Sequence, residues 1–194
     1  MAIREELGDR NGIAGSLINL SAIVAARGDL TRSRQFAQEA YDIGVEIDSK
    51  SAMIGALQRI AKADLMMGNA GDAVLNYAAA ETIARTIGDR VNEHDSRHGI
   101  ARARIRLGDY DDADVIAAEL LQFARENNMD RHVAAAIALQ AEVRMARQQW
   151  NEAVALLEEV LEISSHIGDQ AVADASHVHP VSYTHLTLPT TSRV

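Results

Sequence analysis

The residues with the clearest metal-binding potential are two histidines in the middle of the chain. His94 and His98 stand four residues apart, with Glu93 and Asp95 beside them, and this spacing places two imidazoles on one face of a helix. Imidazoles and carboxylates are ligands of divalent transition metals. The set lacks a third convergent ligand of obvious origin, so we expect surface histidines and predict no metal, cofactor or catalytic residues here.

A second group of side chains is basic. Arg59 and Lys62 are three residues apart, and His98, Arg102 and Arg106 follow one another at steps of four, so each set shares one helical face. Forked guanidinium groups suit carboxylates. The whole chain carries a formal charge of -9, which makes these residues a candidate strip for an anionic ligand. The alternative is an ordinary solvated helix face.

Composition excludes several functions. The chain has no cysteine, which removes disulfides, thiolate catalysis and cysteine-held metals. We also find no glycine-rich phosphate loop, nucleophile elbow or complete metal-ligand set, so we predict that the chain is not an enzyme. The negative charge argues against direct binding of nucleic acid or an anionic membrane. With no signal-like or membrane-length apolar run, the expected location is cytoplasmic.

The chain repeats every forty residues. Gly28-Asp29 recurs as Gly68-Asn69, as Gly108-Asp109 and, more loosely, as Gln148-Gln149. A second set of marks has the same spacing in antiphase: Gly8-Asp9, Asp48-Ser49, Gly88-Asp89, Asn128-Met129 and Gly168-Asp169. Glycine can take the left-handed conformation that ends a helix, and the polar residue after it can cap the next helix.

Two such turns per repeat predict two helices per repeat. Between the marks, apolar residues recur at steps of three and four, as in Leu17, Leu20 and Val24, which is the helical period. We predict helices at 11–27, 31–47, 51–67, 71–87, 91–107, 111–127, 131–147 and 151–167, an all-α chain of antiparallel hairpins.

Small and aromatic residues recur in phase with these marks. Ala101, Gly108, Asp109, Tyr110 and Ala113 form a string that resembles the tetratricopeptide repeat (TPR). The resemblance covers residues 1–178 and implies a right-handed α-solenoid of stacked antiparallel hairpins with a period of 40. A HEAT-type array, whose period overlaps this one, is the alternative fold. Tyr77, Tyr110 and Trp150 are expected to be packing aromatics.

The resemblance also implies where a partner binds. In this family the first helix of each pair lines the concave face and contacts proteins or peptides through its outward positions. In this chain those positions include Leu139, and the main predicted partner-binding residues on the concave face are Asn19, Gln58, Arg59, Lys62, His98, Arg102 and Arg106.

The unit of forty residues is longer than the usual TPR and resembles the MalT-like type found in bacterial regulators and signalling ATPases. The expected function is a protein- or peptide-binding scaffold within such a protein, and an acidic segment is one candidate ligand. The alternative is a ligand-controlled switch that senses a small effector or signalling peptide and regulates an attached ATPase or DNA-binding domain. Residues 179–194 are expected to be disordered or artefactual, because Ser182-Tyr183-Thr184-His185-Leu186 and the residues after it resemble sequencing-adapter read-through.

Overall fold

The computed structural model describes residues 8–167, and in this part of the chain every regular element is a helix. The fold is all-α, as predicted, and each predicted helix is present with its start shifted by one residue. No helix in the described range is long and apolar enough to cross a membrane. The predicted tail, 179–194, lies outside the described residues. The helices are α2 (Arg10–Ala26), α3 (Leu30–Glu46), α4 (Lys50–Met66), α5 (Ala70–Thr86), α6 (Arg90–Leu107), α7 (Tyr110–Glu126), α8 (Asp130–Ala146) and α9 (Trp150–Ile167).

A left-handed residue marks every turn between these helices. Residues with positive φ occur every twenty positions: Gly8, Gly28, Asp48, Gly68, Gly88, Gly108, Asn128 and Gln148. At Gly28 the φ of 87° suits a residue without a Cβ atom. The three non-glycine turns have φ between 51° and 61°, a region that Asn and Asp tolerate better than most residues. The forty-residue repeat is therefore two equal twenty-residue steps.

Most of the predicted helix caps are present. The side chains of Asp9, Asp29, Ser49 and Asp89 each accept a hydrogen bond from a backbone N–H in the first turn of the following helix. Asn69 makes no such bond, so the prediction was wrong there. The bonds that Asp89 accepts from the side chain and backbone of Asn92 lower the pKa of Asp89, because they stabilise its charged form.

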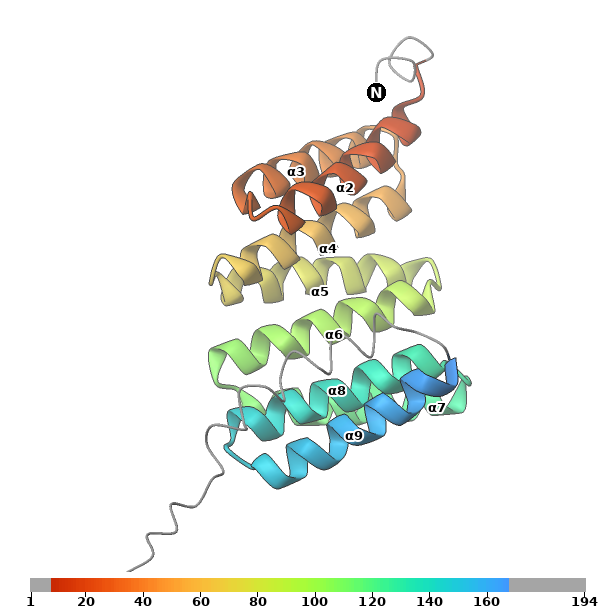
Figure 1. The fold of residues 1–194 in the computed structure, drawn as a ribbon. Coiled ribbons are helices and arrows are strands. Elements are labelled where there is room, and N and C mark those ends of the chain that lie inside the picture. The colour runs from red at the N-terminus through yellow and green to blue at the C-terminus, as the bar shows by residue number, and fades with distance from the viewer. Residues whose placement is uncertain (1–7, 168–194) are drawn as a thin grey trace, which may run out of the picture. The chain divides into compact units, whose positions relative to one another are not determined.

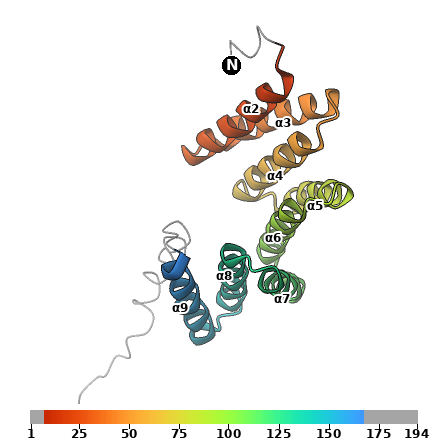
Figure 2. The same cartoon turned by 90° about the vertical axis from the view of Figure 1, so that its right-hand side faces the viewer.

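The chain divides into two compact units, 1–113 and 114–194, and the division falls inside α7. In the first unit, successive helices from α2 to α6 pack against one another, α2 also packs against α4, and α4 against α6. The helices α2, α4 and α6 thus form one continuous layer, and α3 and α5 are the second members of the hairpins (Figures 1 and 2).

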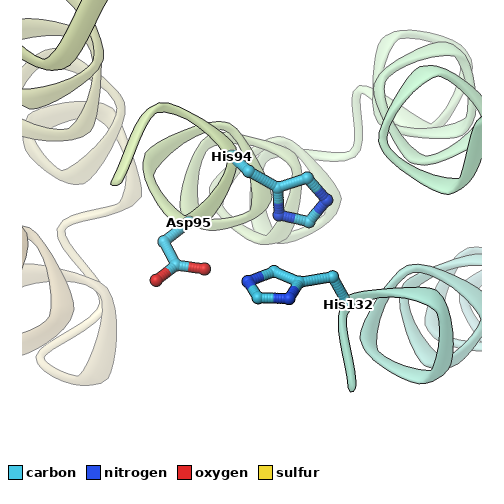
Figure 3. Close-up of side chains that lie close together, drawn as sticks. All are labelled: His94, Asp95 and His132. Carbon is cyan, nitrogen blue, oxygen red and sulfur yellow. The ribbon is translucent and has the colours of Figure 1, made fainter. Parts of the chain in front are cut away.

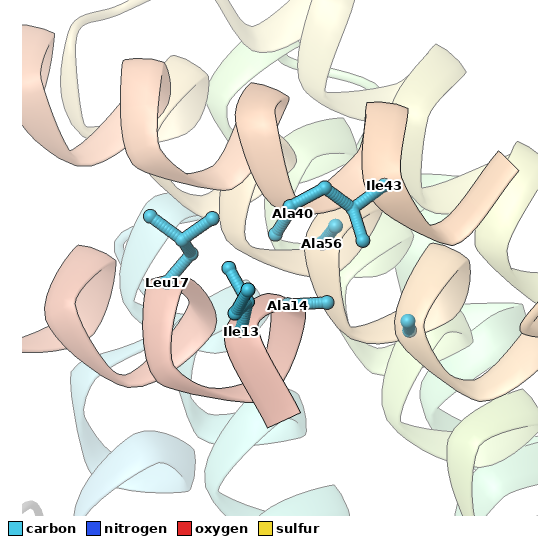
Figure 4. Close-up of a cluster of buried hydrophobic side chains, with 7 residues drawn as sticks. Ile13, Ala14, Leu17, Ala40, Ile43 and Ala56 are labelled. Atoms are coloured by element: carbon cyan, nitrogen blue, oxygen red, sulfur yellow. The ribbon is translucent and has the colours of Figure 1, made fainter. Parts of the chain in front are cut away.

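The core of the first unit is built largely from alanine and branched aliphatic residues. Ile13, Leu17 and Ile43 pack around Ala14 and Ala40 (Figure 4). Small side chains allow the helix backbones to approach closely, and the larger side chains fill the space between hairpins. In the second unit, Ile137 of α8 and Val160 of α9 are buried together in an equivalent cluster.

The close-packed position in the first hairpin is polar. Ser21 and Ser33 are both buried, and their hydroxyl groups lie 2.9 Å apart, within hydrogen-bonding distance. Forty residues later the same positions hold Ala61 and Ala73, which are also fully buried. The hydrogen bond therefore gives the two buried hydroxyl groups a partner at positions where only small side chains fit.

A candidate binding face on α2, α4 and α6

The predicted basic residues of the first unit lie on the layer formed by α2, α4 and α6. We call Arg59 and Lys62 of α4 with Arg102 and Arg106 of α6 the cationic face. Lys62, Arg102 and Arg106 are exposed, and Arg59 is partly buried. Asn19 of α2 is also exposed, and His98 of α6 is partly buried. The layer thus carries residues from three successive hairpins on one side of the unit.

Electrostatic effects show that the central cations share one neighbourhood. Burial lowers the pKa of the Lys62 ammonium, and the positive charges of Arg59 and Arg102 lower it further. Burial raises the pKa of Tyr77, while Arg102 and Arg59 act in the opposite direction. The positive charges of Arg59, Lys62 and Arg102 therefore act on one another, and a nearby anion would stabilise them.

Two of these cations have no acidic partner within residues 8–167. Arg59 and Lys62 form no ion pair with any described residue, whereas other arginines of the first unit do. Arg34 contacts Asp64 at 2.8 Å, and Arg104 contacts Asp109 at 2.8 Å. The positive charge of Arg59 and Lys62 is therefore available to a ligand without breaking an internal salt bridge.

Gln58 has a structural contact that its sequence position did not reveal. Its amide Nε2 lies 3.0 Å from Ser96 Oγ and 3.3 Å from Asn92 Oδ1, both on α6. Gln58 therefore ties α4 to α6 at one end of the layer. A side chain held in this way positions the two helices that carry the cationic face.

Two of the sequence-based assignments need correction. Leu139, predicted to face outward in the fourth repeat, is fully buried, because an apolar side chain at this position packs into the core instead of facing solvent. Trp150 remains 39% exposed, so it packs less fully than predicted. Tyr77, in contrast, is 8% exposed and is a packing aromatic as expected.

The acidic neighbour of the histidines is engaged elsewhere. Glu93 contacts Arg85 at 3.0 Å and Arg90 at 2.8 Å. Burial would raise the pKa of Glu93, but the hydrogen bonds from these two arginines lower it below its ordinary value. A carboxylate held by two guanidinium groups is a poor metal ligand, because the metal would have to displace both.

The two predicted histidines have different environments. His94 is 3% exposed, so the expectation of a surface histidine is wrong for this residue. Figure 3 shows the side chains of His94 and Asp95 extending from α6 and labels His132 of α8. His98 joins no group of three or more close potential metal ligands within the described residues. His94, His98 and Glu93 therefore do not form one set of metal ligands.

Comparisons with known proteins place the fold in the class of TPR-like helical repeats. No protein-family model matches the chain, and no curated protein matches it. A solved structure that does match is that of a putative kinesin light chain from Podosopora anserina, described as having nearly identical TPR-like repeats. The two chains are 18% identical, with a TM-score of 0.62, over 80% of this chain and 76% of that one. At this identity the likeness shows the fold alone.

Proposed function

We propose that this chain is a non-catalytic interaction module that binds an acidic segment of a protein partner on the cationic face. The observation that carries the proposal is that Arg59 and Lys62 share a positive neighbourhood without an acidic partner among the described residues, in a chain of net charge -9. Proteins of the TPR-like class bind proteins or peptides, which agrees with this use of the layer.

The physical basis of binding is charge complementarity. An acidic segment that lies across α4 and α6 meets Arg59 and Lys62 first and then Arg102 and Arg106, in the order in which the helices stack. Guanidinium groups can each grip a carboxylate through two hydrogen bonds. Acidic ligands are also attracted over a distance, which raises the association rate at low ionic strength.

Charge reversal on this face tests the proposal. In Arg59→Glu the affinity for a fluorescein-labelled poly-glutamate peptide is expected to fall about tenfold or more, which corresponds to 1.4 kcal/mol or more of binding free energy. Fluorescence anisotropy at about 0.01 M and 0.15 M salt measures the effect, since the Debye length shortens from about 30 Å to about 8 Å. The loss is expected to be larger at the lower salt concentration.

The matched control is Arg32→Glu. It makes the same change of charge at an exposed residue in the first turn of α3, where a negative side chain suits the helix N-terminus. Its affinity is expected to stay within about twofold of the parent, a difference of less than 0.5 kcal/mol. Equal weakening in the two variants would show that only net charge matters, and the cationic face would then not be the site.

The wider context is a separate part of the proposal. We place the chain in a larger bacterial regulatory or signalling protein of the MalT-like type, because the forty-residue unit is typical of such arrays. The sequence that flanks this segment in its gene tests this placement. An adjoining ATPase or helix-turn-helix domain would support it, and flanking regions of an unrelated class would contradict it.

A further inference from the structure

A small cavity lies beside the cationic face, between α2, α3 and α4. Its volume is about 140 Å³. Both unpaired cations, Arg59 and Lys62, are part of its wall, and most of the rest is apolar. The remaining lining residues are Ala22, Ala25, Ala26, Ser33, Ala63 and Met66.

The cavity exists because the first repeat has small side chains where later repeats have long ones. Ala22, Ala25 and Ala26 lie on α2, and forty residues later the same positions hold Lys62, Leu65 and Met66. A further forty residues on they hold Arg102, Ile105 and Arg106. The three alanines that line the cavity are therefore smaller than the side chains at the equivalent positions of α4 and α6.

The chemistry of the lining is amphipathic. Alanine methyl groups offer an apolar surface, and the Met66 thioether, 53% exposed, is a flexible wall that can adapt to a guest. An apolar cavity of about 150 Å³ is large enough for a benzene molecule, so a single branched aliphatic side chain fits here. Arg59 and Lys62 place two positive charges in the cavity wall, and these charges suit an anion next to that side chain.

We propose that the cavity receives an aliphatic side chain of the partner peptide while Arg59 and Lys62 hold the carboxylate of the adjacent acidic residue. The ligand is thus a peptide in which Leu, Ile, Val or Met directly neighbours Glu or Asp. Consecutive Cα atoms are about 3.8 Å apart. In a peptide backbone with three residues per turn, neighbouring side chains diverge by only a third of a turn, so both can reach one site.

A peptide is favoured over a free small acid because the cations continue beyond the cavity. Arg102 contributes to the field at Lys62, and Arg106 lies one helical turn further along α6. A ligand that uses both helices has to reach from α4 to α6, which a peptide can do and a free small acid cannot. This inference rests on the proposed function and specifies which acidic segment the cationic face selects.

The test compares two labelled peptides that differ only in the aliphatic residue, Gly-Glu-Leu-Glu-Gly and Gly-Glu-Gly-Glu-Gly. The parent is expected to bind the leucine peptide about tenfold more tightly, because the leucine side chain is removed from water. In Ala22→Leu the new side chain fills the cavity, so the two peptides are expected to bind within about twofold of each other. The matched control is Gln35→Leu, which adds a leucine at an exposed position of α3 and should keep the tenfold preference.

A second measurement does not depend on a variant that must fold. Intermolecular nuclear Overhauser effects are expected between the peptide leucine methyls and the methyls of Ala22, Ala26 and Met66. Their absence in a saturated complex of the parent would overturn the inference.

The outcomes separate the two proposals. If both peptides bind equally well to the parent, with salt dependence and with loss in Arg59→Glu, the cationic face is a site and the aliphatic cavity is not. If neither peptide binds the parent, both the cavity and the cationic face are overturned.

Discussion

At the scale of single residues, the contact between Tyr77 and Gly99 shows how size is matched across helices. A Cβ atom added at Gly99 would lie 2.4 Å from two carbons of the Tyr77 ring, so the ring rests directly on the α6 backbone. The positions forty residues after Tyr77 and Gly99 hold Ala117 and Leu139. The large residue and the small one at the first pair of positions are thus replaced by a small residue and a large one forty residues later.

We therefore expect Gly99→Ala to lower the free energy of unfolding by about 1–3 kcal/mol, because the new methyl group forces the aromatic ring to move. The double variant Tyr77→Ala with Gly99→Leu, which copies the later pair, should recover part of that loss. Urea denaturation followed by circular dichroism measures both changes.

Gly15→Ala is the matched control for this prediction. Gly15 lies inside α2, and nothing is within 4 Å of an added Cβ atom. The change should stabilise the protein by about 0.5–1 kcal/mol, since glycine is unfavourable within a helix. If Gly99→Ala were as stabilising as Gly15→Ala, the close contact with Tyr77 would not restrain this interface.

At the scale of helices, ion pairs join neighbouring hairpins. The same pair of positions carries an ion pair twice along the chain, with the acidic and the basic residue interchanged. Arg34 of α3 contacts the buried Asp64 of α4 at 2.8 Å, and Asn76 donates to the other carboxylate oxygen at 3.0 Å. Eighty residues later, Asp114 of α7 and Arg144 of α8 pair at 2.8 Å. The same two positions therefore accept the pair in either orientation.

This exchange predicts that the first pair can be reversed. Arg34→Asp leaves the buried Asp64 opposite a like charge, and Asp64→Arg puts a second positive charge at the buried position opposite Arg34. Each variant should therefore lower the free energy of unfolding by about 1–3 kcal/mol. The double variant should lose clearly less than the sum of the two. A double-mutant cycle in urea gives the coupling energy.

The exposed pair Arg10 and Glu46, which joins α2 to α3, provides the comparison. Reversal of this pair should change stability by less than about 0.5 kcal/mol, because solvent screens the charges. If the losses of unfolding free energy in Arg34→Asp and Asp64→Arg were additive, other contacts, such as that of Asn76, would fix which position carries the acidic residue.

At the scale of the whole molecule, the chain consists of two compact units with the division in α7. In a repeat protein each repeat contacts mainly its neighbours, so stability is a sum of local terms and partial unfolding is expected. The single tryptophan, Trp150, lies in the second unit and reports on that unit alone, whereas circular dichroism reports on all helices.

A destabilising change in the first unit should therefore separate the two signals. In Gly99→Ala, the urea midpoint from circular dichroism is expected to fall while the midpoint from Trp150 fluorescence stays close to that of the parent. Equal shifts of both midpoints would show that the two units unfold as one cooperative body.

Local features of the sequence were sufficient to predict the elements of this fold. The turn marks at Gly28 and Asp48 predicted helix ends to within a residue, because a left-handed turn residue and a capping side chain act on the nearest backbone groups. The forty-residue period predicted the hairpins for the same reason. The failures, such as the missing cap at Asn69, concern single hydrogen bonds whose formation depends on side-chain orientation.

The sequence by itself thus determined the helices, their period and the helical faces on which the basic residues lie, since each of these depends on residues close together in the chain. Only the tertiary structure decided which cations keep an internal partner, that Gln58 bridges two helices and that Leu139 is buried. The alanine-lined cavity beside Arg59 and Lys62 also became visible only there. These features arise where side chains thirty or more residues apart meet, and the contact of two helix faces depends on the volume and charge of both.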